Sequence, residues 1–364
     1  MDIMVKKSLV INREQADTKF IIGKDLISNI NDLSIIPENT SGFILIADKN
    51  VTSFYGSKLM RSLQKHNKPI CLIEIEAKEE NKSFNQVQKI LCILLNKRVN
   101  RNFLLINLGG GIISDIGGFV ASILYRGISF INIPTTLLSQ VDAAIGGKTG
   151  VNFRIHNFLH KNMVGVIHMP LAVISDIDTL KTLPEKEIKN GLGEMLKYSL
   201  ISKKVMISDL IQIRNGVQNC MLLSKLVSEC QNIKIAVVKA DPYDTYGIRE
   251  KLNLGHTIGH GIESASNGKL SHGQCVATGI VVITKISMEQ GLLSAKSCNE
   301  IIKNINNLGL PVTIHNLNIK RIINSIKLDK KRGTFVLIKK IGDILTNQMV
   351  EESLVQKILK EISI

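Results

Sequence analysis

Two imidazoles and a guanidinium lie close together in the segment REKLNLGHTIGH, residues 249–260. Read as one helix, this segment places polar side chains at i, i+4, i+7 and i+11 on a single face: Arg249, Asn253, His256 and His260. Core leucines normally occupy that spacing. The glycines at 255, 259 and 261 lower helix propensity and let a partner helix or a ligand come close. The face therefore predicts a binding or catalytic surface.

Metal binding is one chemistry that these side chains could perform. Three of the eight histidines lie between positions 256 and 272: His256, His260 and His272. A second predicted helix, LPEKEIKNGLGEMLKY, places four polar residues on one face: Glu187, Asn190, Glu194 and Lys197. Two histidines and a carboxylate can bind Zn²⁺ while leaving coordination positions open for substrate oxygens. A solvent-exposed polar face would explain the second helix equally well.

Glycine-rich segments could bind phosphate or a nucleotide. LGGGIISDIGGF follows a predicted strand and leads into a helix, so its backbone N–H groups could contact a pyrophosphate. It departs from the GxGxxG dinucleotide fingerprint, and a simple tight connection is an equal alternative. The segments IPTTLLSQVDAAIGGKTGVN and HKNMVG add Lys148, Lys161 and Asn162, which we expect in loops at strand ends, where they suit a phosphate or a carboxylate. A solvent-exposed side chain is the alternative for each lysine taken singly.

Short apolar runs alternate with helical patterns in the first half of the chain. The runs are FILIAD (43–48), PICLIEI (69–75), FLLINLGGG (103–111), FINIPTT (130–136) and AVISD (172–176). Their length and their boundaries predict strands buried on both faces of a parallel sheet. Helical patterns dominate from about residue 185, with a short strand pair expected at 333–343. The sequence therefore predicts an α/β, Rossmann-like nucleotide-binding domain (1–180) and a mainly α-helical metal- and substrate-binding domain (181–364).

The composition restricts the class of protein. The 364 residues carry a formal net charge of +15, and 44% of them are hydrophobic. The lysines are dispersed and there is no tryptophan, which favours an anionic small molecule over nucleic acid as the partner. A solvated surface without a partner is the other interpretation of the charge. No run of residues is typical of a membrane span or a secretory signal, so we expect a cytoplasmic protein with reduced cysteines.

Seven motifs together resemble those of 3-dehydroquinate synthase, a family of sugar-phosphate cyclases in the shikimate pathway, which leads to chorismate and the aromatic amino acids. The family patterns are GGGxxxDxxGF, RGxxFxxxPTTLLxQxD, GGKTxxN, GKNxxG, LPxxExxxGxxExxKY, RxxxNxGHTxGHxxE and HGxxVxxG. They stand here, in the family's order, at Gly109–Phe119, Arg126–Asp142, Gly146–Asn152, Lys161–Gly165, Leu183–Tyr198, Arg249–Glu263 and His272–Gly279.

The resemblance implies a role for each matching residue. The implied ligands of Zn²⁺ or Co²⁺ are Glu194, His256 and His272. The implied NAD contacts are Asp48, Asn50, Glu79, Lys82, Gly111, Ile112, Ile113, Ser114, Asp115, Thr135, Thr136, Lys148, Lys161, Thr179, Leu180, Lys181, Thr182 and Asn190. The implied substrate-binding residues are Asp142, Lys161, Asn162, Lys234 and Arg126, and the implied catalytic residues are His260, Lys197, Lys148, Arg249 and Asn253. In the family, the arginine that Arg126 matches reaches into a neighbouring subunit, which implies a homodimer.

Several positions depart from the family pattern. The connection 153–160 is longer than usual, and His160 stands where the family has a glycine before its lysine. Ser114 also replaces a glycine, next to the expected pyrophosphate turn. A late lysine of the family matches either Lys330 or Lys331. The implied metal ligands match without exception.

The activity implied is the conversion of 3-deoxy-arabino-heptulosonate 7-phosphate to 3-dehydroquinate and phosphate, with NAD regenerated in every turnover. The first alternative is a metal-dependent polyol or alcohol dehydrogenase with the same two-domain plan, which would release NADH. Another sugar-phosphate cyclase is the second. A catalytically inactive scaffold or a nucleic-acid binder is the third, and the presence of Glu194, His256 and His272 together argues against it.

Overall fold

The computed structural model describes residues 6–7, 17–155, 158–214, 219–329 and 334–364. The chain divides into two compact units, Met1–Leu183 and Pro184–Ile364. Each unit has its own secondary structure and its own buried interior. Lys330 and Lys331, the two candidates for the family's late lysine, lie outside the described residues.

Unit 1 is built on a seven-stranded sheet with the order β1-β2-β9-β6-β5-β3-β4. The strands are β1 (Lys6–Lys7), β2 (Lys19–Gly23), β3 (Gly42–Asp48), β4 (Ile70–Ile75), β5 (Phe103–Gly109), β6 (Phe130–Pro134) and β9 (Ala172–Asp176). All neighbours from β2 to β4 are parallel, and β1 pairs antiparallel with β2. The five strands predicted from the apolar runs are confirmed, as is the α/β, Rossmann-like class. Strands β1 and β2 were not predicted.

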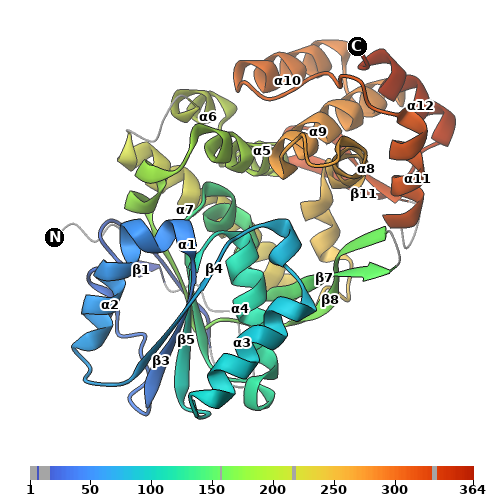
Figure 1. Ribbon diagram of the computed structural model, residues 1–364. Helices are drawn as coiled ribbons and strands as arrows, with labels where there is room; N and C mark the ends of the chain where they lie inside the picture. Colours follow the sequence, from blue (N-terminus) through green and yellow to red (C-terminus); the bar gives the residue numbers. More distant parts are fainter. Residues whose placement is uncertain (1–5, 8–16, 156–157, 215–218, 330–333) are drawn as a thin grey trace. The chain divides into compact units, whose positions relative to one another are not determined.

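Helices cover both faces of this sheet, and successive residues of the interior strand β3 explain how. Ile44 and Ile46 of β3 pack in the layer that contains α3 and α4, whereas Phe43 and Leu45 pack in the layer that contains α2. In Figure 1, α2 accordingly lies on one side of the sheet and α3 and α4 lie on the other. The α-helices of unit 1 are α1 (Lys49–Val51), α2 (Ser57–Gln64), α3 (Phe84–Asn96) and α4 (Gly111–Ile123). Its other helical turns are η1 (Ile30–Leu33), η2 (Thr52–Gly56), η3 (Glu79–Asn81), η4 (Leu124–Arg126), η5 (Ser139–Ala143) and η6 (Ile177–Thr182).

A β-hairpin outside the main sheet corrects one prediction. Strand β7 (Lys148–Ile155) pairs antiparallel with β8 (Phe158–Ile167). The prediction that Lys161 and Asn162 lie in a loop is therefore wrong, and Lys148 begins a strand. Most of the long connection 153–160 continues the two strands, because each strand satisfies the backbone hydrogen bonds of the other. The sequence gives little sign of this pairing, since its side chains do not alternate cleanly between apolar and polar.

Unit 2 is mainly helical, as predicted. Its elements are α5 (Glu185–Ile201), α6 (Ile207–Ile213), α7 (Cys220–Ala240), η7 (Ile248–Asn253), α8 (His256–Ser266), α9 (His272–Glu289), α10 (Ala295–Asn307), α11 (Ile319–Asp329), β10 (Thr334–Lys340), β11 (Asp343–Met349) and α12 (Glu352–Glu361). The predicted strand pair is the antiparallel hairpin β10–β11. Among the described residues, no helix combines the length and the apolar character that crossing a membrane requires.

The single helix expected over residues 249–260 is wrong. Arg249 and Asn253 lie on the 3-10 turn η7, and α8 begins only at His256. Gly255, with φ of 77°, separates the two elements, since this left-handed conformation breaks a helix and favours glycine. The polar residues are thus divided between two elements.

Glycines set the close approach of α5, α8 and α9. A Cβ on Gly193 of α5 would lie 2.1 Å from the carbonyl oxygen of Gly273 on α9, and a Cβ on Gly273 would lie 1.9 Å from that of Asn190. A Cβ on Gly279 of α9 would lie 2.1 Å from the carbonyl oxygen of Gly255. Backbone atoms cannot rotate away as a side chain could, so these contacts require glycine.

We predict that Gly273→Ala lowers the free energy of unfolding by about 3 kcal/mol, because the new methyl group must displace backbone. Urea unfolding followed by circular dichroism measures the change. The control is Gly268→Ala, which has φ of 80° and open space around it and should cost only about 1 kcal/mol of backbone strain. Equal losses in the two variants would contradict the close contact.

Candidate active site

Two imidazoles converge on one buried carboxylate in unit 2. Oε1 of Glu194 lies 3.1 Å from Nε2 of His256 and 3.0 Å from Nε2 of His272. One ligand atom from each of the three residues lies within 4.8 Å of the others. The Glu194 side chain is 1% exposed, while both imidazoles are partly accessible. The sequence-predicted metal ligands are therefore neighbours.

Each of the three side chains has a local reason for its position. Glu194 lies inside α5, His256 is the first residue of α8, and His272 is the first residue of α9. The carbonyl oxygen of Leu254 lies 3.1 Å from Nδ1 of His256, which turns Nε2 towards Glu194. The start of α9 is held by Asn190, whose Oδ1 accepts a 2.7 Å hydrogen bond from the N–H of Gly273.

The electrostatics of the cluster suit a cation. Burial raises the pKa of the Glu194 carboxyl, but Lys197 and the two imidazoles outweigh it and hold the pKa well below the usual range. Burial lowers the pKa of His256. Burial also opposes a charge on His272, but contacts with Glu194 and Glu263 outweigh it and raise the pKa of His272 to about 10. Without a metal, the carboxylate thus depends on protonated neighbours.

The three donors fit a divalent metal ion. Tetrahedral Zn²⁺ with bonds of about 2.0–2.1 Å separates its ligand atoms by about 3.3 Å, and the distances from Oε1 to the imidazole nitrogens are within a few tenths of an ångström of that. Two imidazole nitrogens and one carboxylate oxygen are the donor set of catalytic zinc sites, which keep a position open for substrate.

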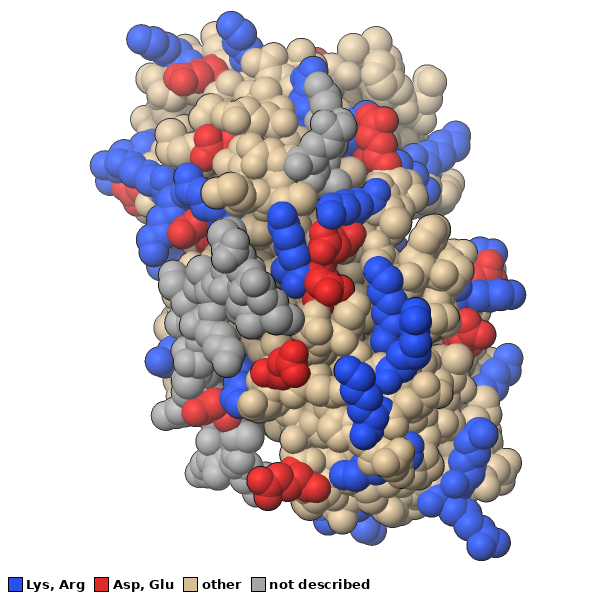
Figure 2. Space-filling view, turned by 90° about the vertical axis from the view of Figure 1, so that its left-hand side faces the viewer, with Lys and Arg blue, Asp and Glu red and all other residues tan. Residues whose placement is uncertain are grey.

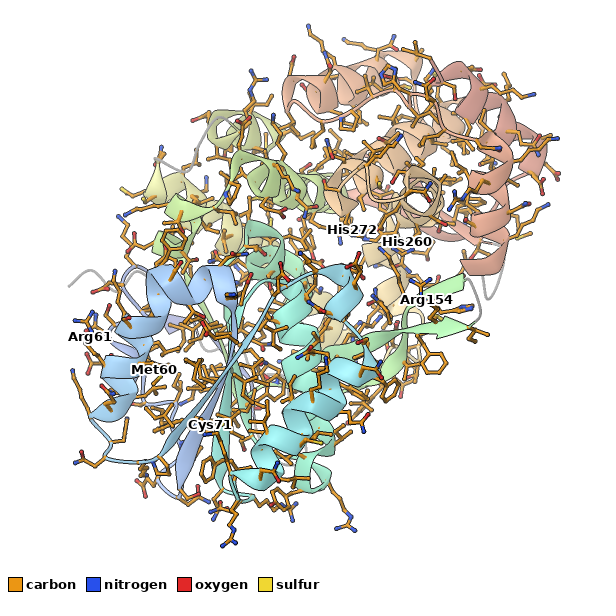
Figure 3. All side chains as sticks on the ribbon, in the orientation of Figure 1. Met60, Arg61, Cys71, Arg154, His260 and His272 are labelled. Carbon is orange, nitrogen blue, oxygen red and sulfur yellow. The ribbon has the colours of Figure 1, made fainter. Side chains whose placement is uncertain are left out.

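Two further predicted residues, Lys197 and His260, lie next to this cluster. Lys197, 1% exposed, places Nζ 2.5 Å from Oε2 of Glu194 and 4.7 Å from the centre of the Tyr198 ring. His260 lies one turn beyond His256 on α8, and the two ring centres are 5.6 Å apart. Figure 3 shows His260 beside His272, with ring centres 6.0 Å apart. Lys234 of α7 and Arg249 are also buried, whereas Asn253 is exposed.

Unit 1 places a second group of predicted residues at the carboxyl ends of β3 and β5. The chain passes from β3 outward to β4 and returns to β5 on the other side of β3, and such a switch point is where open α/β sheets bind ligands. Asp48 ends β3, and Gly109 ends β5 with its Cβ position 3.3 Å from Cβ of Asp48. Helix α4 starts directly after Gly110, so its N-terminal N–H groups lie at the same edge.

The glycine turn, Gly109–Gly111, has features of a pyrophosphate-binding turn. It leads into the N-terminus of α4, whose free N–H groups favour an anion. A Cβ on Gly110 would lie 3.0 Å from the side chain of Thr136, and one on Gly111 would lie 3.0 Å from that of Ala143, so glycine lets the turn pack closely against both residues. Ser114, which replaces a glycine of the family pattern, is buried, and its Oγ lies 3.4 Å from the carbonyl oxygen of Gly110.

Lys82 joins the expected cofactor and substrate residues of unit 1. It is 5% exposed, and its ammonium group donates to Asp115 on α4 and to Asn162 on β8. Next to it, Nδ2 of Asn152 donates to Oε1 of Glu79 at 2.6 Å, while Oδ1 of Asn152 accepts from the N–H of Asn162 at 3.2 Å. The hairpin is thereby attached to the residues around the glycine turn.

Gln140 ties the remaining predicted cofactor residues together. Its fully buried side chain donates to the carbonyl oxygens of Pro134 and Asp176 and to Oγ1 of Thr179. These bonds fix the ends of β6 and β9, and with them Thr135, Thr136 and the turn Thr179–Thr182.

Comparison with known proteins identifies the family. The model of the 3-dehydroquinate synthase N-terminal region matches residues 72–190, and that of the C-terminal region matches residues 191–332. The chain belongs to the 3-dehydroquinate synthase family.

Curated members of the 3-dehydroquinate synthase family are similar over nearly their full length. The 3-dehydroquinate synthase of Clostridium botulinum is 39% identical, with 91% of this chain and 93% of that protein covered. That of Pelagibacter ubique is 36% identical, with 97% and 98% covered. Among solved structures, 2-deoxy-scyllo-inosose synthase complexed with carbaglucose-6-phosphate, NAD⁺ and Co²⁺ has a TM-score of 0.86 at 23% identity, over 98% of this chain and 100% of that one. This last likeness concerns the fold.

Two other predicted residues of this 3-dehydroquinate synthase family member, Asn190 and Arg126, lie in different environments. Asn190, expected to contact NAD, uses its amide to bond Gly273 and Glu187. Arg126 is exposed on η4, with φ of 62°. No role for Gln140, Asn152 or Asp241 was predicted from the sequence. Asp241 is fully buried and accepts hydrogen bonds from the backbone N–H groups of the loop before Arg249. In the sequence, Gln140 and Asn152 stand out only as members of a motif, and Asp241 only as a neighbour of Arg249 along the chain.

We predict that metal loading of this family member depends on pH. Since the pKa of His272 is raised to about 10, the metal-free ring carries a proton at neutral pH, and binding through Nε2 must release it. The pKa of His256 is lowered, so that ring is already neutral. Affinity for Co²⁺ should therefore rise about tenfold per pH unit between about pH 6.5 and about pH 8. Calorimetry in buffers of different ionisation enthalpy measures the proton release.

A variant in which the exposed His315 is replaced by asparagine is the control and should keep the same slope. Affinity that does not change with pH would contradict the assigned protonation of His272.

Proposed function

We propose that this chain converts 3-deoxy-arabino-heptulosonate 7-phosphate to 3-dehydroquinate and phosphate, as a 3-dehydroquinate synthase. The observation that carries the proposal is the convergence of His256, His272 and Lys197 on the buried carboxylate of Glu194, in a chain of this family. A buried carboxylate with two imidazoles and an ammonium group is costly to assemble for packing alone. It suits an enzyme that must hold a cation and move protons beside it.

The cofactors proposed are NAD and one divalent metal ion, Zn²⁺ or Co²⁺. NAD would be held at the glycine turn of unit 1 with Asp48, and the metal by Glu194, His256 and His272. Bound there, NAD would supply a hydride acceptor and the cation would polarise substrate oxygens. The oxidised cofactor is regenerated in every turnover, because the product is at the same oxidation level as the substrate.

Side chains of the protein hold the protons and the charged ends of the substrate. The imidazole of His260 lies next to the ligand cluster, where it can accept a hydroxyl proton. The ammonium group of Lys197, beside the same cluster, can stabilise the negative charge that develops on the oxygen. Lys234 and Arg249 are buried cations of unit 2, and Asn253 follows on the same turn as Arg249. Such cations suit a carboxylate or a phosphate.

Unit 1 contributes further substrate-binding residues to the proposal. These are Asp142, Lys148, Lys161 and Asn162, and the last of them is fixed by Lys82. Arg126 would reach the neighbouring copy in a homodimer. The lysines in this set are the feature that a polyol dehydrogenase would lack, since its substrate has no phosphate.

An anionic small molecule also fits the charge of the surface better than nucleic acid. On the face shown in Figure 2, Lys and Arg side chains are spread widely, with Asp and Glu side chains among them. A nucleic-acid-binding face usually concentrates basic residues in one stripe or patch.

The test is incubation of the protein with the heptulosonate phosphate, NAD⁺ and Zn²⁺ while phosphate and NADH are followed together. We expect steady release of phosphate without net NADH. Glu194→Ala should lose activity by more than about 100-fold, because it removes a metal ligand and the negative charge that Lys197 contacts in a buried site. Exposed Glu185→Ala, on the first turn of the same helix, is the matched control and should retain activity.

Lasting NADH formation in proportion to turnover would instead support the dehydrogenase. Phosphate release that survives both a chelator and Glu194→Ala would contradict the metal assignment.

A further inference from the structure

Glu263 contacts the side of the His272 ring that the proposed metal does not use. Oε2 of Glu263 lies 3.2 Å from Nδ1 of His272, while Nε2 of the same ring faces Glu194 at 3.0 Å. The function proposed above assigns Glu263 no role. The described residues whose ligand atoms converge are Glu194, His256 and His272, and Glu263 is outside that set.

The position of Glu263 follows from α8. It lies seven residues after His256, two helical turns along the same face, so one helix supplies both a ligand and the partner of a second ligand. Gly259 of α8 keeps that helix close to α9, since a Cβ there would lie 3.0 Å from the carbonyl oxygen of Cys275. The Glu263 side chain is only 19% exposed. Because it is mostly shielded from water, its hydrogen bond is stronger than the same bond in open water.

The contact has a chemical consequence for the ring. A neutral imidazole carries its proton on one nitrogen and its free lone pair on the other. A carboxylate that accepts Nδ1–H therefore fixes the tautomer in which Nε2 has the lone pair, and it also fixes the rotation of the ring. His256 is held similarly, but by the carbonyl oxygen of Leu254. The two ligands thus differ in the charge of their partners.

We propose that Glu263 is a positioning residue that accepts Nδ1–H of His272 and keeps Nε2 of that ring available to the metal. This inference rests on the metal site of the proposed function. A carboxylate behind an imidazole ligand also makes that imidazole a stronger donor. Glu263 should therefore affect metal affinity more than the folding of unit 2.

The experiment compares Co²⁺ affinity of the unmodified protein, Glu263→Ala and Glu263→Gln, without substrate or NAD. Competition with a chromophoric chelator gives each dissociation constant. Glu263→Ala should bind Co²⁺ about 10- to 100-fold more weakly. Glu263→Gln should lie between the two, because its amide oxygen can still accept Nδ1–H but carries no charge. The control is Glu289→Ala at the end of α9, which removes an exposed ion pair with Lys357 of α12. This variant should bind Co²⁺ as tightly as the unmodified protein does.

Equal Co²⁺ affinity of the unmodified protein and either Glu263 variant, within twofold, would overturn the proposal. So would an equal loss in Glu289→Ala, which would indicate a general effect of charge. If Glu263→Ala does not fold, the near-isosteric Glu263→Gln still decides the matter. Failure of the proposed function has a different signature: the unmodified protein would bind Co²⁺ but release no phosphate.

Discussion

The structure of unit 2 depends on one buried carboxylate that must be neutralised. Glu194 is removed from water, so its charge is tolerated only because Lys197, His256 and His272 surround it. These residues come from three different helices, and the carboxylate therefore selects one relative placement of α5, α8 and α9. A divalent cation relieves the same constraint, since it replaces the proton on His272 as the positive partner.

Close helix contact makes this convergence possible. Gly193, Gly273 and Gly279 remove the side chains that would separate the three helices. The amide of Asn190 then bonds the first turn of α9, where His272 begins the helix. Packing, capping and charge therefore act on the same few residues. A substitution at any of these glycines should therefore displace the proposed metal ligands.

Much of the fold and the types of residue at the candidate metal site could be predicted from the sequence. The buried strands have apolar runs and clear boundaries, and Glu194, His256 and His272 are of residue types that bind metals. The hairpin β7–β8 could not be predicted, because its pairing depends on a partner strand and not on its own pattern. The break at Gly255 was missed because spacing alone cannot distinguish a long helix from two elements separated by a left-handed residue. Contacts distant in sequence, such as the one between Asn152 and Glu79, leave no local signal.

The central claim is that Glu194, His256 and His272 bind one divalent cation. X-ray absorption spectroscopy of the Co²⁺-loaded protein tests it directly. The account predicts scattering from two imidazoles and oxygen ligands, with bonds of about 2.0–2.1 Å. A coordination sphere without imidazole scattering, or one that contains sulfur from the cysteines, would contradict it.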